Sequence, residues 1–223
     1  MTGTIVNAGA ILVGGLIGLA AAGRIPERVK TILMQALGLS TLIIGLQMAL
    51  SAREVIPIVS SLLLGALTGE LLRIEDGLER IGHWLKKRAR SDSSTFVTGF
   101  VTTSLLYCTG AMVVVGAIQD GTTGNATTLY IKAMLDGVAS IAFASTLGIG
   151  VLFSAASVLL LQGSITLLSS NLAFLQQPAV LGPVTSTGGL LIVAIAINLL
   201  NIAKIRIGNL LPALFYAVLI ALL

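Results

Sequence analysis

Long apolar stretches alternate along the chain with short connections that hold most of its charged residues. A helix needs about 20 predominantly apolar residues to cross the hydrocarbon core of a bilayer. Stretches of about that length cover residues 4–22, 32–50, 56–73, 96–117, 133–150, 151–169, 185–202 and 207–223. The pattern therefore predicts an all-α protein, a polytopic transmembrane helix bundle of about eight spans that forms a single transmembrane domain over residues 1–223.

The segment 131–169 can be divided in more than one way. A break is marked there only by Thr146-Leu147-Gly148-Ile149-Gly150, and no charged residue stands at it. Two spans and a re-entrant pair both fit this pattern. One long tilted helix also fits, and it would leave about seven spans.

The Lys and Arg residues predict how the chain is oriented. They gather in three connections, at residues 24–30, 73–90 and 204–206, whereas residues 119–130 and 170–184 contain neither. Because basic residues in short loops favour the cytoplasmic side, both termini are expected outside, and about eight spans satisfy this while seven do not. Arg53, beside Glu54, is the exception. No basic residue precedes the first stretch and no small-residue cleavage site follows it, so we expect a retained span.

The connector at residues 74–91 has an amphipathic pattern. Its apolar residues fall three or four positions apart, with Trp84 beside them; they are Ile74, Leu78, Ile81 and Leu85. This predicts a cytoplasmic helix on the membrane surface, with Trp84 as an interfacial anchor. A tethering linker is the commoner role for such a helix, and a regulatory or partner-binding helix is the alternative. His83 lies on the polar face, where we expect it to be solvated.

The composition indicates lipid as the surrounding solvent. Hydrophobic residues make up 56% of the 223 residues and charged residues 10%, against about 25% charged in soluble globular chains. The net charge of +4 does not indicate nucleic acid as a partner, because the basic residues lie mostly at the ends of apolar stretches. The single cysteine, Cys108, excludes a disulfide framework within one chain and a thiol metal cluster.

Polar side chains inside the predicted spans fall at helical spacings. Lys132, Asp136 and Ser140 follow one another at steps of four, on one face of one helix. Most such polar residues join helices by hydrogen bonds, but a carboxylate there needs a partner, a cation or a proton. Lys132 is the ordinary partner for Asp136. The alternative is a substrate or ion path whose candidate residues are Asp120, Asp136, Thr109, Gln162 and Asn198.

Glycines predict close helix packing and helix breaks. Gly14 and Gly18, four positions apart, give the first span a face that can approach another helix closely. Thr109-Gly110 and the segment 146–150 are candidate breaks at which free backbone groups would line a cavity. A packing role is the commoner one for any single glycine of this kind.

A weak internal repeat is also visible. Without gaps, residues 38–47 align with residues 189–198, and Arg53 then falls on Lys204. By the predicted orientation the two copies cross the membrane in opposite directions, so the pair would form an inverted repeat of the kind found in transporters.

Several segments together resemble a family of small bacterial inner-membrane proteins, the YdfK and YqgA type, which carries a domain-of-unknown-function label. The resemblance spans nearly the whole chain. The segments that carry it are residues 3–8, 108–112 through 119–121, 132 through 136–137, 148–154, 162–163 and 208–214. The resemblance implies a multi-pass protein of the bacterial inner membrane, and it supplies no substrate, mechanism or residue roles.

These observations favour a secondary transporter or channel-like carrier for a small polar solute or an ion. The alternative is a non-transporting membrane scaffold or regulatory protein whose polar stripes only join helices. An enzyme is not expected, because the only His lies in the connector and no paired-aspartate protease motif occurs. No phosphate-binding Gly-rich loop is present for an ATP-driven pump. We expect no cofactor and no metal; the expected partners are the lipid bilayer and the solute or ion, and a homo-oligomer is open.

Overall fold

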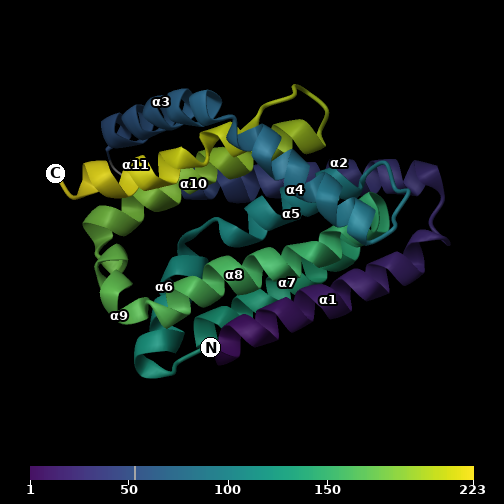
Figure 1. Cartoon of the computed structure of the whole chain (residues 1–223), viewed down its shortest axis with the longest axis horizontal. Coiled ribbons are helices and arrows are strands. Elements are labelled where there is room, and N and C mark those ends of the chain that lie inside the picture. Colours follow the sequence, from purple (N-terminus) through teal and green to yellow (C-terminus); the bar gives the residue numbers. More distant parts are fainter. Residues whose placement is uncertain (53) are drawn as a thin grey trace. The chain divides into compact units, whose positions relative to one another are not determined.

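The computed structural model describes residues 1–52 and 54–223, so Arg53, the exception among the basic residues and the proposed counterpart of Lys204, lies outside the described residues. All regular elements of the described part are helical (Figure 1). They are α1 (Thr2–Ala22), α2 (Glu27–Ala49), α3 (Val55–Leu72), α4 (Ile74–Arg88), α5 (Phe96–Cys108), α6 (Ala111–Thr123), α7 (Thr127–Leu147), η1 (Gly148–Phe153), α8 (Ser154–Leu167), α9 (Ser169–Leu172), η2 (Ala173–Gln176), α10 (Pro178–Leu199), η3 (Ile207–Leu210) and α11 (Pro212–Ala221). The predicted all-α class is confirmed.

Five helical stretches of the described chain are long and apolar enough to cross a membrane. They are α1, α2, α3, Thr127–Leu167 and α10, and the pair α5 and α6, bent by 62°, adds a sixth if it is one span. The chain is therefore a membrane helix bundle. The predicted count of about eight spans is not confirmed by these lengths.

Helix α1 shows the packing that lipid imposes. Its buried face consists of small and polar residues together with one large aliphatic side chain; it comprises Gly3, Thr4, Asn7, Ala8, Ile11, Gly14, Gly15 and Gly18. Bulky side chains such as Ile5, Val13 and Leu16 are more than half exposed. Large aliphatic groups outside and small or polar groups inside are the arrangement expected where the surroundings are as apolar as leucine.

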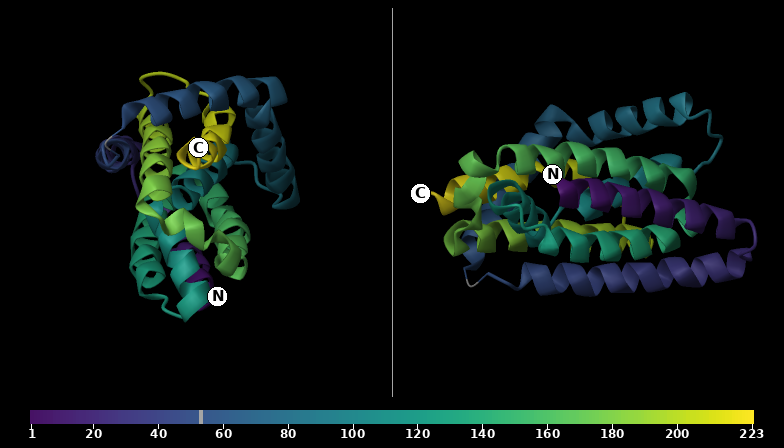
Figure 2. Two further views of the ribbon diagram at one scale, coloured as in Figure 1. Left: turned by 90° about the vertical axis from the view of Figure 1, so that its left-hand side faces the viewer. Right: turned by 90° about the horizontal axis from the view of Figure 1, so that it is seen from below.

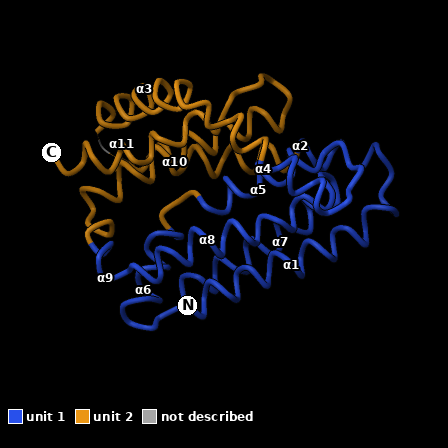
Figure 3. Tube along the Cα trace, in the orientation of Figure 1, with its two compact units in different colours: residues 1–35, 81–108, 112–173 blue, residues 36–80, 109–111, 174–223 orange. Residues whose placement is uncertain are grey.

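The contacts of the chain cluster in two compact units whose segments alternate along the sequence (Figure 3). Unit 1 comprises Met1–Gln35, Ile81–Cys108 and Met112–Ala173, and unit 2 comprises Ala36–Arg80, Thr109–Ala111 and Phe174–Leu223. The sequence pattern indicated a single transmembrane domain over residues 1–223, without a signal for this division.

In unit 1, α1 lies alongside α7 and runs parallel to it (Figures 1 and 2). A Cβ added at Gly14 would lie 2.1 Å from the carbonyl oxygen of Gly137, and one added at Gly18 would lie 2.3 Å from that of Ile141. These distances are far below van der Waals contact, so only glycine allows the two backbones to approach so closely.

The chain reverses between α7 and α8. Helix α8 runs antiparallel to α1, because Gly15 lies against Leu152 while Thr4 reaches Thr166. Since α7 is parallel to α1, the 41-residue stretch Thr127–Leu167 consists of two antiparallel arms joined at η1. Gly148 begins the turn with a φ of 81°, a conformation that glycine adopts without strain.

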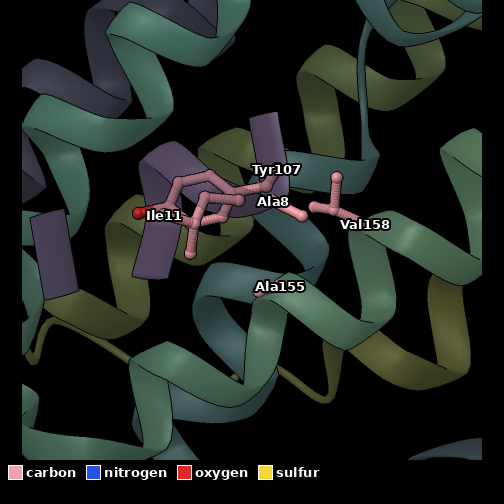
Figure 4. Packing of buried hydrophobic residues seen from close by; sticks show 5 residues of the cluster. All are labelled: Ala8, Ile11, Tyr107, Ala155 and Val158. Carbon is pink, nitrogen blue, oxygen red and sulfur yellow. The ribbon is translucent and has the colours of Figure 1, made fainter. Parts of the chain in front are cut away.

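Helix α5 completes the interior of unit 1 by packing on α7, α8 and η1. Its Tyr107 is 1% exposed and joins a hydrophobic cluster with Ala8 and Ile11 of α1 and with Ala155 and Val158 of α8. Figure 4 shows the phenol ring of Tyr107 beside Ile11, between these helices. The cluster holds three sequence-distant helices together beside the polar groups described below.

In unit 2, small residues bring two helix pairs close together. The position of Gly38 faces Leu200, and Gly189 faces Ala49, so this part of α2 runs antiparallel to α10. The positions of Gly65 and Gly69 face Ala213 and Asn209, so α3 runs antiparallel to η3 and α11.

The predicted inverted repeat relates these same helices, α2 and α3 to α10 and α11. Antiparallel neighbours are compatible with such a repeat but occur equally in bundles without one. The repeat is therefore not confirmed and stays a prediction.

The predicted connector helix is present as α4, Ile74–Arg88. Its buried Gly82 packs on Val97 of α5, so that side of the helix faces protein. Ile81 and Trp84 are 51% and 63% exposed. The apolar residues of α4 are thus divided between a protein-facing side and an exposed side that carries Trp84.

Candidate functional site

The centre of unit 1 contains a buried ion pair on α7. Lys132 and Asp136 are 5% and 8% exposed, and the Lys132 ammonium donates a hydrogen bond to Asp136 Oδ2. Their helix turns Ile131, Met134 and Leu135 outward. The charged residues of α7 therefore point into the bundle while its large apolar residues face the surroundings, as intramembrane charges do.

Asn7 of α1 joins this pair to α8. Its Nδ2 donates to Asp136 Oδ2 at 3.0 Å and to Gln162 Oε1 at 3.2 Å. Gln162 Nε2 donates to Thr4 Oγ1 at 3.1 Å, and Thr4 Oγ1 lies 3.3 Å from Thr166 Oγ1. Five polar side chains beside Lys132 thus form one continuous hydrogen-bond network across α1, α7 and α8.

One acceptor of this network has no hydrogen-bond partner among the described residues: Asn7 Oδ1, on a side chain that is fully buried. The orientation of the amide follows from its neighbours, because Nδ2 faces two acceptor oxygens and a flipped amide would bring three oxygens together. A buried acceptor left unpaired costs about 1–3 kcal/mol. The Asn7 oxygen therefore marks a point where a hydrogen-bond donor or a cation would be favoured.

Tyr107 lies next to the ion pair. Its hydroxyl lies 2.8 Å from Ser140 Oγ, one turn beyond Asp136, and its ring centroid lies 5.8 Å from Lys132 Nζ. That distance is within the range of a cation–π interaction. The ammonium therefore has a carboxylate and an aromatic face as neighbours.

Asp120 of α6 occupies a different position in unit 1. Its Oδ2 accepts a hydrogen bond from the backbone N–H of Gly3 at 3.1 Å and lies 3.0 Å from the Met1 nitrogen. Gly121, the next residue, packs against Thr166 and Ser169 of the α8–α9 region. Asp120 therefore lies beside the first turn of α1, where its partner Gly3 directly precedes Thr4 of the network.

The other two path candidates, Thr109 and Asn198, belong to unit 2. Both ends of the Asn198 amide are engaged by the backbone of Ile205, with N···O distances of 2.8 Å. Through these two hydrogen bonds the Asn198 side chain holds the loop that follows α10.

Thr109 precedes the break between α5 and α6, where Gly110 has a φ of 126°. Its methyl group lies against the backbone position of Gly188, and Gly110 lies against Met48. Packing is the commoner role predicted for such glycines, whereas Gly110 and Gly148 stand at chain breaks with left-handed φ angles.

A second polar cluster in unit 2 was not predicted from the sequence. Asn209, 5% exposed, donates to Glu70 Oε2 at 2.6 Å and accepts from the Glu75 backbone N–H at 2.7 Å. Arg206 pairs with Glu70 at 3.2 Å, and the Glu75 carboxylate accepts from the Gly208 N–H. Burial raises the pKa of Glu75, against the lowering effect of the Gly208 hydrogen bond. The cluster fastens the start of η3 to the junction of α3 and α4.

The sequence held a signal for both missed elements. Asn7 stands three residues after Thr4 in an apolar helix, and Gly208-Asn209 is part of a segment that carried the family resemblance. Both positions carry neutral amides, whereas Asp136 was selected because a carboxylate inside a span needs a partner, a cation or a proton.

Two bacterial proteins and one family are similar to this chain over nearly its whole length. The chain is 30% identical over 223 residues to a protein of Escherichia coli strain K12 named "Uncharacterized protein YqgA", covering 96% of this chain and 94% of that protein. It is 31% identical over 218 residues to the "Uncharacterized membrane protein YdfK" of Bacillus subtilis strain 168, with 96% and 93% covered. No solved structure matches. Residues 2–222 match a family described as "Protein of unknown function (DUF554)", and the chain belongs to this family.

Proposed function

We propose that this protein is a secondary transporter or channel-like carrier of a small polar solute or an ion across the bacterial inner membrane. The observation that carries the proposal is the buried Lys132–Asp136 pair within the network of Asn7 and Gln162. Intramembrane ion pairs of this kind occur mainly on pathways for ions, protons or polar substrates.

The energetics support a functional reason for the pair. Placing a charged side chain at the centre of a spanning helix costs about 2.5–3.5 kcal/mol. Replacing a buried ion pair by apolar residues is often neutral or stabilises by about 1–4 kcal/mol. Fold stability alone therefore gives no reason for two charges on the inward face of α7.

The proposed path of the chain has eight crossings. α5 with α6 forms one crossing, α7 and α8 form two because the chain reverses at η1, and η3 with α11 forms the last. In unit 1, Thr95 bonds to the carbonyl of Leu147 at 2.8 Å, so the start of α5 and the end of α7 lie at one end. In unit 2, Arg206 pairs with Glu70 near the end of α3. Within each unit the basic connections gather at one end, which we assign to the cytoplasm.

A membrane scaffold is the second candidate, and one observation favours it. The network side chains bond mainly to one another, as residues that only join helices do. The two functions predict different results for a variant that folds but lacks both charges. A carrier loses solute or ion flux in such a variant, whereas a scaffold has no flux to lose.

The test compares Asp136→Asn with a double variant, Lys132→Met with Asp136→Leu. The single change leaves Lys132 as a buried cation without its carboxylate, so folded yield should fall, and the double change should recover it. The purified proteins are first screened by thermal shift against amino acids, organic acids and inorganic ions. Flux of each stabilising compound is then measured in liposomes.

For a carrier, the well-folded double variant loses flux that the unaltered protein shows. Undiminished flux in a well-folded double variant removes the pair from the mechanism. No stabilising compound and no flux for the unaltered protein supports the scaffold.

A further inference from the structure

We propose that the network in unit 1 binds an alkali-metal cation, which competes with the Lys132 ammonium for the Asp136 carboxylate. This inference rests on the proposed carrier function and names its coupling ion. The cation's ligands on this chain are the Asp136 carboxylate and Asn7 Oδ1.

The donors and acceptors around Asn7 are not balanced. Asn7 uses both hydrogens of its amide, on Asp136 and on Gln162, and its oxygen has no partner in the described part of the chain. The neighbouring Gln162 and Thr4 add further oxygens on the same network. A fully buried amide oxygen next to a carboxylate has the chemistry of a site for a hard monovalent cation, since carbonyl and carboxylate oxygens coordinate such ions in membrane proteins.

The Asp136 carboxylate already has a cation of the chain beside it, the Lys132 ammonium. The Lys132 ammonium is tethered four residues from Asp136 and neutralises it, so the site carries no net charge without a ligand. An incoming cation gains the carboxylate only if the ammonium moves away. The Tyr107 ring, whose centroid lies 5.8 Å from Nζ, would still be a neighbour of the ammonium after it gives up the carboxylate. Lys132 thus acts as an internal competitor that keeps the affinity for a cation low.

An alkali cation and a proton would affect the network differently. A proton on Asp136 would also release Lys132, but it would leave the Asn7 oxygen without a partner. An alkali cation has several coordination positions, so one ion can take both the carboxylate and the unpaired amide oxygen as ligands. The unpaired Asn7 oxygen beside this ion pair therefore favours binding of Na⁺ or K⁺ over protonation of Asp136.

The experiment measures thermal unfolding of the purified full-length protein in NaCl, KCl and choline chloride at equal ionic strength, together with equilibrium binding of ²²Na⁺. The variants are Lys132→Met and Asp136→Asn. Lys30→Met is the matched control, because Lys30 also pairs with a carboxylate on its own helix, that of Glu27 at 2.7 Å, but at the surface.

We expect the unaltered protein to show saturable stabilisation by NaCl or KCl relative to choline chloride. Lys132→Met removes the competitor, so its apparent Kd for the cation should fall at least about tenfold, equivalent to about 1.4 kcal/mol. Asp136→Asn should abolish the effect, and Lys30→Met should behave like the unaltered protein.

Equal unfolding temperatures in all three salts for both the unaltered protein and Lys132→Met would overturn the proposal. Stabilisation by acid pH with no difference among the salts would overturn it in favour of a proton. If either single variant folds poorly, ²²Na⁺ binding to the unaltered protein and its loss in the folded double variant, Lys132→Met with Asp136→Leu, decide the question.

Binding is measured without a gradient, so the outcome is separate from that of the carrier function. Retained solute flux without any cation effect contradicts this inference alone. Cation binding with no flux of any compound contradicts the carrier and leaves the site in place.

Discussion

Lys132 and Asp136 could be paired from the sequence because they lie four positions apart on one helix. Asn7 could not be placed beside them, because its partners Asp136 and Gln162 lie 129 and 155 positions away. Helical spacing relates residues within one span, whereas this network arises where three spans meet. Local spacing thus predicted the ion pair but not the residue that connects it to the other helices.

Replacing Asn7 by Ala should lower stability by about 1–3 kcal/mol, because the change removes two buried hydrogen bonds and leaves acceptors of Asp136 and Gln162 without their donor. Unfolding in a mild denaturant series measures this. Asn171→Ala, at an exposed position, is the control and should change stability by less than about 0.5 kcal/mol. Equal effects of the two changes would show that the network does not stabilise unit 1.

Glu75 should make stability depend on pH. Its pKa is raised from 4.5, mainly because the carboxylate is partly buried and also because Glu79 lies near, while the Gly208 hydrogen bond, Arg206 and Lys204 act in the opposite direction. An acid whose pKa is higher in the folded state binds its proton more tightly there. Stability therefore falls as pH rises from about 4.5 through the folded-state pKa.

Glu75→Gln should weaken this pH dependence, since an amide oxygen still accepts the Gly208 hydrogen bond without becoming charged. The measurement is the unfolding temperature between pH 5 and pH 8, and the exposed neighbour Asp76→Asn is the control. An unchanged pH profile in Glu75→Gln would assign the dependence to other groups.

At the scale of elements, the length of the apolar stretches was sufficient to predict most helices, but it did not predict their ends or breaks. Gly14 and Gly110 both stand in apolar stretches, yet Gly14 packs inside a helix while Gly110 interrupts one with a φ of 126°. Which role a glycine takes depends on the neighbouring helix, which a single sequence does not specify. For the same reason the reversal at η1 stayed one of three alternatives.

Gly14→Ala should destabilise the contact of α1 with α7 by about 1–3 kcal/mol, because the added methyl would lie 2.1 Å from the Gly137 carbonyl oxygen and the backbones must separate. Gly9→Ala on the same helix meets nothing within 4 Å. That control should be neutral or stabilise by up to about 1 kcal/mol through helix propensity. Thermal unfolding of both variants measures the difference, and similar values would contradict the close packing of these helices.

At the scale of the whole molecule, the two units consist of segments that alternate along the chain. No pattern in the sequence predicted this alternation, because outward-facing Ile, Leu and Val contact lipid as readily as protein and do not specify a neighbour. Charge is different, since Lys and Arg are sorted by the two sides of the membrane. The arrangement with the strongest basis in the sequence is therefore the orientation.

Single-cysteine labelling tests that orientation. With Cys108 replaced, cysteines are placed at Lys87, in the basic end of α4, and at Asn125, in the Lys- and Arg-free loop before α7; both positions are exposed. The positive-inside distribution predicts that an impermeant maleimide added to intact cells labels position 125 and not 87. Both should react after the membrane is permeabilised, which shows that each cysteine is accessible. Labelling of position 87 alone in intact cells would contradict the predicted orientation. The chain would then be inverted in the membrane and the Glu75 cluster would lie outside. The Lys132–Asp136 network would then be reached from the cytoplasm through the opposite end of unit 1.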